Sequence, residues 1–204
     1  MKYYKIDPDL FGAEWAYGEV YSQCIRYDPS VRPVTCPLCG RDIEGSRWVG
    51  EYNVKVSRKK LGDVIYGVPD LLLVSERFVA LCKQNHIRGI TQFTEVSLFY
   101  RGKKLDTRYF QATIGYSMKK LAFAKEQNRK RMSDKSLPKC SLCMKSGNGA
   151  KDDWKQRYCT GEPDADIFKI YEKKGRIFCD QVFVDFCKEN KITNIIDYFR
   201  EIVV

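Results

Sequence analysis

The stretches SERFVALCKQNHIRGI (residues 75–90) and DQVFVDFCKENKITNI (residues 180–195) decide how this chain is organised. When the second is laid on the first, so that residue 75 faces residue 180, seven of the sixteen positions are identical. The identical pairs are Phe78 and Phe183, Val79 and Val184, Cys82 and Cys187, Lys83 and Lys188, Asn85 and Asn190, Ile87 and Ile192, and Ile90 and Ile195. Self-similarity at a fixed offset predicts a structural unit that occurs twice.

Each copy predicts a strand, a helix and a second strand. An apolar run comes first, at residues 71–74 and 176–179. Ser75 and Asp180 then stand where a helix N-cap is expected, since their side-chain oxygens can accept from the first free amides. A β-rich run follows each helix, at residues 90–100 and 195–204.

The two predicted helices are amphipathic. Apolar residues recur at i, i+1, i+3 and i+4, which places them on one face. They are residues 78, 79, 81 and 82 in the first copy and 183, 184, 186 and 187 in the second. We expect this face, with Cys82 and Cys187, to pack in the core. Asn85 and Asn190 are expected to end the helices in the left-handed conformation.

The fold class predicted from these patterns is α+β. Further strands are expected at residues 1–6, 14–23 and 108–117, and a polar connector or exposed helix at residues 119–139. Residues 1–204 should form a single domain built from two similar halves, each a Cys knuckle followed by strand, helix and strand. The halves span about residues 31–100 and 135–204, with a connector over about 118–139, and a pseudo-twofold relation between them is expected.

Two CxxC motifs stand 104 residues apart, in TCPLCGRD (residues 35–42) and KCSLCMKSG (residues 139–147). Two cysteines separated by two residues can direct both thiolates at one ion, and tetrahedral zinc needs two such knuckles. Cys36, Cys39, Cys140 and Cys143 are therefore the predicted ligands of one structural zinc per chain. Pro37 should stiffen the first knuckle, and Gly40 should leave room where the backbone turns towards sulfur.

Other interpretations of the cysteines stay open. The four could be ordinary buried cysteines, which are common in cores, or one pair could be a redox CxxC with a low-pKa thiol. Cys24, Cys159 and Cys179 fall outside any pair spacing, although Cys159 lies near enough to the second knuckle in sequence to be a spare ligand.

Composition favours an ordered globular protein with an anionic partner. The chain has 204 residues, 44% hydrophobic content, nine cysteines and a formal net charge of +10. The sequence contains no apolar run of about eighteen residues, which a membrane span would need. The start MKYYKIDPDLFG has no apolar signal-peptide core. We expect a cytoplasmic protein with free thiols. The charge would suit nucleic acid, an acidic protein face or a membrane surface.

Catalytic motifs are not evident in the sequence. It contains no phosphate-binding glycine loop, no G-x-S-x-G and no H-E-x-x-H. The single histidine, His86, is expected to be exposed at a helix end. The acid pairs Asp152 with Asp153 and Asp164 with Asp166 are expected to be solvated loop carboxylates. We therefore expect no enzyme.

Basic residues concentrate at 119–139 and 54–63. Nucleic-acid binding would want aromatic residues among them, and Phe123 is the one aromatic in the longer stretch. A solvated surface segment is the favoured interpretation.

The order of these elements resembles the bacterial double-CxxCG motif family. The resemblance rests on the tyrosine-rich opening strand, the CPLCG knuckle, the run DLLLVSERFVALCKQNHIRGI, a short RGK segment, the second CxxC and the closing D-I-F with its strand-helix-strand unit. It covers nearly the whole chain. The second knuckle departs from the family pattern, because CSLCM lacks the glycine.

The resemblance implies an immunity protein of a contact-dependent toxin system. Such a protein binds a cognate toxin domain and blocks it without catalysis, and a basic protein would suit an acidic toxin face. The alternative is a zinc-ribbon protein with a nucleic-acid-binding or regulatory function. Neither the identity of the toxin nor the contact residues follow from the resemblance. Trp48, Tyr52 and Trp154 lie in the loops after the knuckles, where they are candidates for exposed contact residues or could equally fill the core around zinc.

Overall fold

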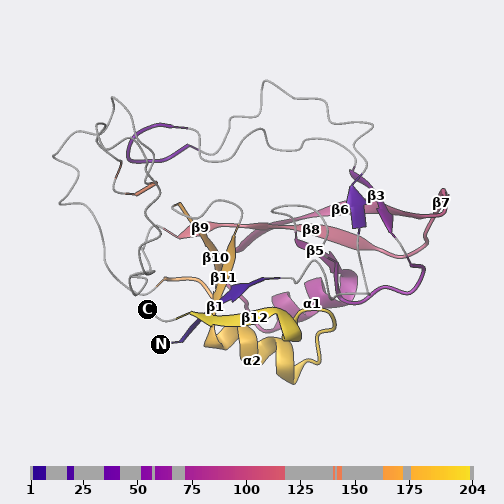
Figure 1. Cartoon of the computed structure of the whole chain (residues 1–204). Coiled ribbons are helices and arrows are strands. Elements are labelled where there is room, and N and C mark those ends of the chain that lie inside the picture. The colour runs from indigo at the N-terminus through magenta and orange to yellow at the C-terminus, as the bar shows by residue number, and fades with distance from the viewer. Residues whose placement is uncertain are drawn as a thin grey trace, which may run out of the picture.

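The protein has a mixed α+β fold, as the sequence predicts (Figure 1). The computed structural model describes residues 2–7, 18–20, 35–41, 52–56, 58–65, 72–117, 140, 142–143, 163–171 and 176–202. This part of the chain forms two α-helices and two β-sheets.

The larger sheet carries the first strand-helix-strand unit. Its strands lie in the order β2 (Gly18–Val20), β3 (Tyr52–Val56), β6 (Ile90–Tyr100), β8 (Tyr109–Ile114), β5 (Leu72–Ser75) and β4 (Val64–Ile65), with β7 (Lys103–Lys104) also paired to β6. The β3 and β6 strands are parallel, and the other pairs in this sheet are antiparallel.

The smaller sheet carries the second unit. Its order is β12 (Phe199–Ile202), β1 (Tyr3–Ile6), β11 (Ile177–Asp180), β10 (Ile167–Ile170) and β9 (Tyr116–Ser117). The sequence predicted a single strand over residues 108–117, whereas the chain leaves the larger sheet after β8 and enters the smaller one at β9. Gly115 lies between them and donates to Gly89 O at 2.8 Å. This crossing joins the two sheets.

The helices begin where the sequence predicts. In α1 (Glu76–Gln84) the Ser75 hydroxyl accepts from Phe78 N at 3.1 Å, and in α2 (Gln181–Glu189) the Asp180 carboxylate accepts from Phe183 N at 3.1 Å. Such caps satisfy amides that have no partner within the helix. The N-cap predictions are therefore confirmed.

The helix ends differ from the prediction by one residue. Asn85 and Asn190 are the C-cap residues, but their φ angles are −94° and −87°. The next residues, His86 and Lys191, adopt the left-handed conformation, with φ of 51° and 49°. Each asparagine side chain instead donates to a helix carbonyl, Leu81 O and Phe186 O respectively, at 2.9 Å.

The two units are built in the same strand register. Strand β8 lies between β5 and β6, where Tyr109 pairs with Ser75 and with Val96. Strand β1 lies between β11 and β12, where Tyr3 pairs with Asp180 and with Ile202. Each N-cap residue therefore faces a tyrosine on an inserted antiparallel strand. The near-twofold rotation predicted between the halves is a separate matter and stays a proposal.

The largest hydrophobic cluster draws on both units. Phe78 of α1 meets Phe186 of α2 edge to face, with ring centroids 6.1 Å apart. The predicted apolar faces pack here: Phe78, Val79, Cys82, Phe183, Val184, Phe186 and Cys187 are buried, and Leu81 is partly buried. A second cluster, around Val54, Leu98 and Tyr109, lies within the larger sheet alone. The prediction of a single domain over residues 1–204 is not tested by these contacts.

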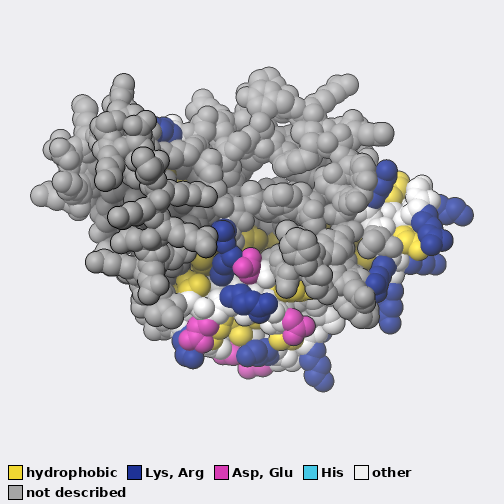
Figure 2. Space-filling model, viewed as in Figure 1, with side chains coloured by type: hydrophobic (Ala, Val, Ile, Leu, Met, Phe, Trp, Pro, Cys, Tyr) yellow, Lys and Arg dark blue, Asp and Glu magenta, His cyan; other side chains and the backbone are white. Residues whose placement is uncertain are grey.

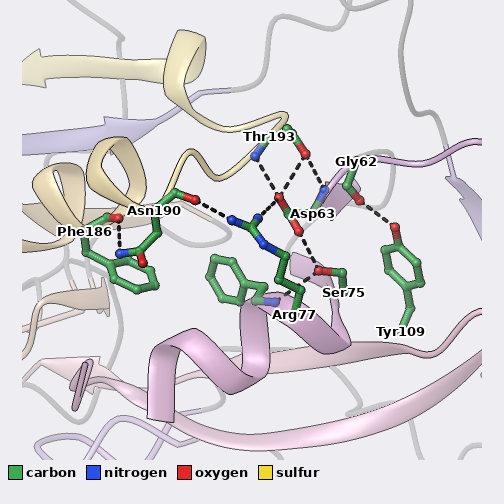
Figure 3. A network of polar contacts seen from close by, with 9 residues as sticks. Gly62, Asp63, Ser75, Arg77, Tyr109, Phe186, Asn190 and Thr193 are labelled. Carbon is green, nitrogen blue, oxygen red and sulfur yellow. Dashed lines mark hydrogen bonds and ion pairs between the residues drawn. The ribbon is translucent and has the colours of Figure 1, made fainter. Parts of the chain in front are cut away.

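Two buried carboxylates join the units reciprocally. Asp63, beside the first unit, accepts from Thr193 N at 3.0 Å in the turn after α2 (Figure 3). Asp166, beside the second unit, accepts from Arg88 N at 2.7 Å in the turn after α1. Asp63 also accepts from Ser75 Oγ and Arg77 Nη1, and Asp166 from the Arg88 guanidinium. Burial of Asp166, 3% exposed, corrects the expectation of a solvated loop carboxylate.

Several elements were not predicted. Strand β3 lies in a stretch interpreted only as a basic cluster, although Val54 and Val56 are buried at alternating positions. Strand β10 was also missed. The run 195–204 begins with a 3-10 turn, Ile196–Tyr198, and only then becomes β12. Of the strand expected over 14–23, only residues 18–20 are described, and the connector at 118–139 lies outside the described residues.

None of the helices in the described part of the chain has the length and apolar character needed to cross a membrane.

Candidate metal centre

The first knuckle is a tight turn closed by backbone hydrogen bonds. Cys36 N donates to Arg41 O at 2.7 Å, and Gly40 N donates to Cys36 O at 2.8 Å. Gly40 has a φ of 69°, a conformation that costs other residues about 1–2 kcal/mol. A Cβ at this position would meet no atom within 4 Å, so the glycine is needed for its backbone conformation and not, as the sequence suggested, for space.

The second knuckle repeats the local arrangement of the first. The amides of Leu38 and Cys39 donate towards the Cys36 sulfur, and the amides of Leu142 and Cys143 donate towards the Cys140 sulfur. Amide donors stabilise a thiolate, which is the form that binds a metal. Of this knuckle the structure describes Cys140, Leu142 and Cys143.

The four predicted ligands lie together. All four sulfurs are within 4.8 Å of one another, with Cys36 Sγ 3.9 Å from Cys140 Sγ and Cys39 Sγ 3.6 Å from Cys143 Sγ. Tetrahedral zinc with Zn–S bonds of about 2.3 Å places its sulfurs ~3.8 Å apart. The donor set therefore fits a metal ion. Four thiolates leave no open coordination position for a substrate.

The cluster is closed off from solvent on most sides. Cys36, Cys140 and Cys143 are buried, and Cys39 is partly exposed. Around them pack Leu38, Leu142 and two tyrosines, Tyr116 of β9 and Tyr171 directly after β10, whose rings lie 4.7 Å apart. No spacing signal in the sequence marks these tyrosines, because they come from elements that meet only in the folded chain. The two tyrosines place the cysteine cluster at the edge of the smaller sheet formed by β9 and β10.

Burial and the amide donors act on the thiols in opposite directions. Burial raises the pKa of Cys36, and its amide donors offset only part of that rise. Burial also acts to raise the pKa of Cys140, but the amides of Cys143 and Leu142, with the neighbouring thiols, bring it below the ordinary value. The cluster thus contains an acidified thiol from which metal binding can displace a proton.

The remaining described cysteines behave as core residues. Cys82, Cys179 and Cys187 are buried in the cluster shared by the two units. Burial raises the pKa of Cys82 to about 12 and raises the pKa of Cys179 and Cys187 as well. A thiol held in its protonated form is a poor nucleophile and a poor ligand. Cys24 and Cys159, the spare-ligand candidate, lie outside the described residues.

The other sequence candidates do not join the centre. His86 is exposed at the end of α1, as predicted, and Asp164 is exposed as well. Asp152, Asp153, Trp48 and Trp154 lie outside the described residues, as does the basic stretch 119–139, and the side chain of Tyr52 is not described. Within the described ranges, the four cysteines are the one group of three or more His, Cys, Asp or Glu placed to hold a metal.

No protein-family model matches the chain, and no curated protein sequence matches it either. The double-CxxCG family therefore stays a resemblance in motif order.

Proposed function

We propose that this chain is a zinc-stabilised binding protein that neutralises a cognate bacterial toxin domain. The proposed metal binding rests on four sulfurs that lie within 4.8 Å of one another and come from two turns 104 residues apart. An all-sulfur set suits zinc or iron, and zinc is the common structural choice. With no open position, the ion would stabilise the fold and take no part in a reaction.

The proposal of a toxin partner rests on the resemblance in motif order. The opening tyrosine strand, both knuckles and the two strand-helix-strand units follow one another as in double-CxxCG immunity proteins. A protein that acts by binding needs a rigid frame more than a reactive group, and the thiol cluster supports such a frame. Free thiols and bound zinc also suit a reducing bacterial cytoplasm.

The metal is tested by its stoichiometry and by one substitution. Purified protein should contain about one zinc per chain, and Cys39→Ser should lose the metal and lower the melting temperature together. Cys82→Ser is the matched control: it should lower stability through the core while leaving the metal content unchanged. Two metals per chain, or none in a well-folded preparation, would overturn the single shared site.

The toxin is tested by calorimetric titration. The probe is the C-terminal domain encoded by the gene immediately upstream in the native locus, in a catalytically inactive form. Tight one-to-one binding is the expected result, and absence of binding with the metal intact would count against an immunity function.

A nucleic-acid-binding function is the second candidate. The net charge of +10 and the gathering of Lys and Arg side chains at one end of the molecule favour it (Figure 2). Binding to an oligonucleotide that weakens steeply with salt would support this candidate.

We also infer that the two halves are related by a near-twofold rotation with exchanged strands. Support comes from the registers, in which β1 joins the C-terminal unit and β8 the N-terminal unit, and from the reciprocal bonds of Asp63 and Asp166. Superposition of residues 72–96 on 177–202 in an experimental structure tests the rotation. Unrelated placement of the two units would reduce the sequence match to similar helix patterning.

A further inference from the structure

Two basic segments that are far apart in the sequence meet at one end of the larger sheet. Strand pairing puts Lys55 of β3 opposite Phe99 of β6, and Phe99 opposite Lys104 of β7. The turn before β4 joins them, because Leu61 packs in the same cluster as Tyr100 and Leu105. We call this surface the basic end; it consists of Lys55, Arg58, Lys59, Lys60, Arg101, Lys103 and Lys104.

The basic end is strongly charged and solvent-accessible. Six of its seven cationic side chains are exposed, and Arg58 is partly exposed. In Figure 2 its Lys and Arg side chains gather at the right, where β7 lies in Figure 1, while acidic side chains lie at the lower left and centre. Among the described residues of 54–60 and 99–106, Asp106 is the single acid.

Several cations elsewhere in the described chain are paired with acids. Ion pairs join Lys2 with Glu201, Arg77 with Asp63, and Arg88 with Asp166. Lys59, Lys60, Lys103 and Lys104 form no such pair within the described residues.

The cations of the basic end lie close enough together to repel one another. Neighbouring strands lie about 4.8 Å apart, and Lys55 and Lys104 both pair with Phe99, so the two lysines are separated by roughly 10 Å on one face. Like charges placed in this way repel. An anionic partner would remove that repulsion.

The surrounding rings favour protein over nucleic acid. Base stacking requires a free ring face. The Tyr100 ring is covered by the Arg101 guanidinium at 5.2 Å from its centroid and packs on the cluster of the larger sheet, and Phe99 is partly buried between two lysines. Among the described residues, the basic end therefore presents positive charge with no fully exposed aromatic ring. Carboxylates arrayed on a protein surface suit it best.

We propose that the basic end is the docking surface for an acidic face of a protein partner. This inference rests on the proposed function to the extent that the partner is a toxin domain. The metal centre lies at the opposite end of the molecule, with the knuckles at the left of Figure 1 and β7 at the right. Charge changes at the basic end should therefore leave the metal in place.

The test compares two double variants of equal charge. Lys103→Glu with Lys104→Glu alters the basic end, and Lys191→Glu with Arg200→Glu alters exposed positions of the second unit; each takes the net charge from +10 to +6. Metal content and circular dichroism establish that both variants fold. The probes are a polyglutamate peptide and an oligothymidylate with the same number of charges.

The basic-end variant should bind polyglutamate about tenfold more weakly at low salt, while the control changes less than about twofold. Equal weakening in both variants would overturn the proposal, and so would absence of polyglutamate binding. Tighter binding of oligothymidylate than of polyglutamate would overturn it in favour of nucleic acid.

Titration with the inactive toxin domain separates this inference from the proposed function. If the wild-type protein binds the toxin and the basic-end variant binds it equally well, the docking surface is wrong and the immunity function stands. If the wild-type protein does not bind the toxin but the polyglutamate results hold, the immunity function is wrong and the acidic-partner surface stands.

Discussion

At the scale of single residues, buried carboxylates connect the two units. Asp63 is 8% exposed and accepts from four donors: Ser75 Oγ, Arg77 Nη1, Thr193 N and Thr193 Oγ1. These donors come from the start of α1 and from the turn after α2. One carboxylate thus fixes both units, and the donors around it would be left without a partner if it were removed.

Asp63→Ala should therefore be strongly destabilising. We expect a loss of about 3 kcal/mol in the free energy of unfolding, because buried donors lose their acceptor while Arg77, which is half exposed, can be rehydrated. Urea denaturation followed by circular dichroism measures the loss. Asp185→Ala is the control, since Asp185 is exposed and its one hydrogen bond among the described residues is to Gln181 of its own helix. A similar loss in both variants would contradict the role of Asp63.

The buried carboxyl of Asp180 should make the stability of the protein depend on pH. Burial, with help from the charge of Asp166, raises the pKa of Asp180 above its ordinary value of 3.8. A carboxyl whose pKa is raised on folding destabilises the folded state when it ionises. The stability that its protonated form provides is therefore lost as pH rises through the folded-state pKa.

Asp180→Asn keeps an N-cap acceptor and removes that charge. The variant should be more stable than the wild type near neutral pH, and this advantage should vanish below the ordinary pKa of 3.8. Thermal unfolding over a pH series measures it. A constant difference across the series would contradict the assignment.

At the scale of elements, the helix ends hold unrelieved strain. His86 and Lys191 occupy the left-handed conformation directly after the C-caps, where glycine is usual. The same backbone bonds accompany both, with Ile87 N donating to Cys82 O at 3.0 Å and Ile192 N to Cys187 O at 2.8 Å. The sequence offers no glycine at either position.

His86→Gly and Lys191→Gly should each stabilise the protein by about 0.5–1 kcal/mol, because glycine adopts this conformation without a Cβ clash. The gains should be similar, since the two ends are built alike. Denaturant midpoints measure them, and Ala80→Gly inside α1 is the control, expected to destabilise by about 1 kcal/mol. Destabilisation by both end variants would show that the left-handed residues carry no strain.

At the scale of the whole molecule, the chain ends are tied together. Strand β1, the first described element, lies between β11 and β12, the last two strands. Ile6 pairs with Ile177 on one side and Phe199 on the other, and it is buried in the shared core. Stability of the C-terminal unit therefore depends on the N-terminal strand.

Ile6→Ala should cost about 2–4 kcal/mol and should loosen the smaller sheet more than the larger one. Residue-resolved hydrogen exchange would detect the loss as faster exchange at β11 and β12 than at β5 and β8. Equal loss across both sheets would mean that the two units unfold as one. Lys5→Ala, on the same strand with its side chain paired to Asp7, is the control and should have a small effect.

The sequence by itself determined the local features of this protein. N-caps at Ser75 and Asp180, the apolar helix faces and the strands on either side follow from residue type and periodicity, since they depend on neighbours within a few positions. The spacing within each CxxC likewise determines that two sulfurs point the same way. The left-handed residue was misplaced by one position because each asparagine stays in the C-cap, where its side chain donates to a helix carbonyl, and the next residue adopts the left-handed conformation.

Only the tertiary structure decided which distant segments meet. Nothing local pairs Tyr3 with Asp180, buries Asp166 under Arg88, or places Lys55 and Lys104 on opposite sides of Phe99. The backbone N–H and C=O groups at a strand edge pair with whichever strand the whole fold places beside them. Burial of a charged side chain depends on a partner that can lie anywhere in the chain. The repeat suggested two similar units, and folding determined that β8 lies between the two strands of the first unit and β1 between the two strands of the second.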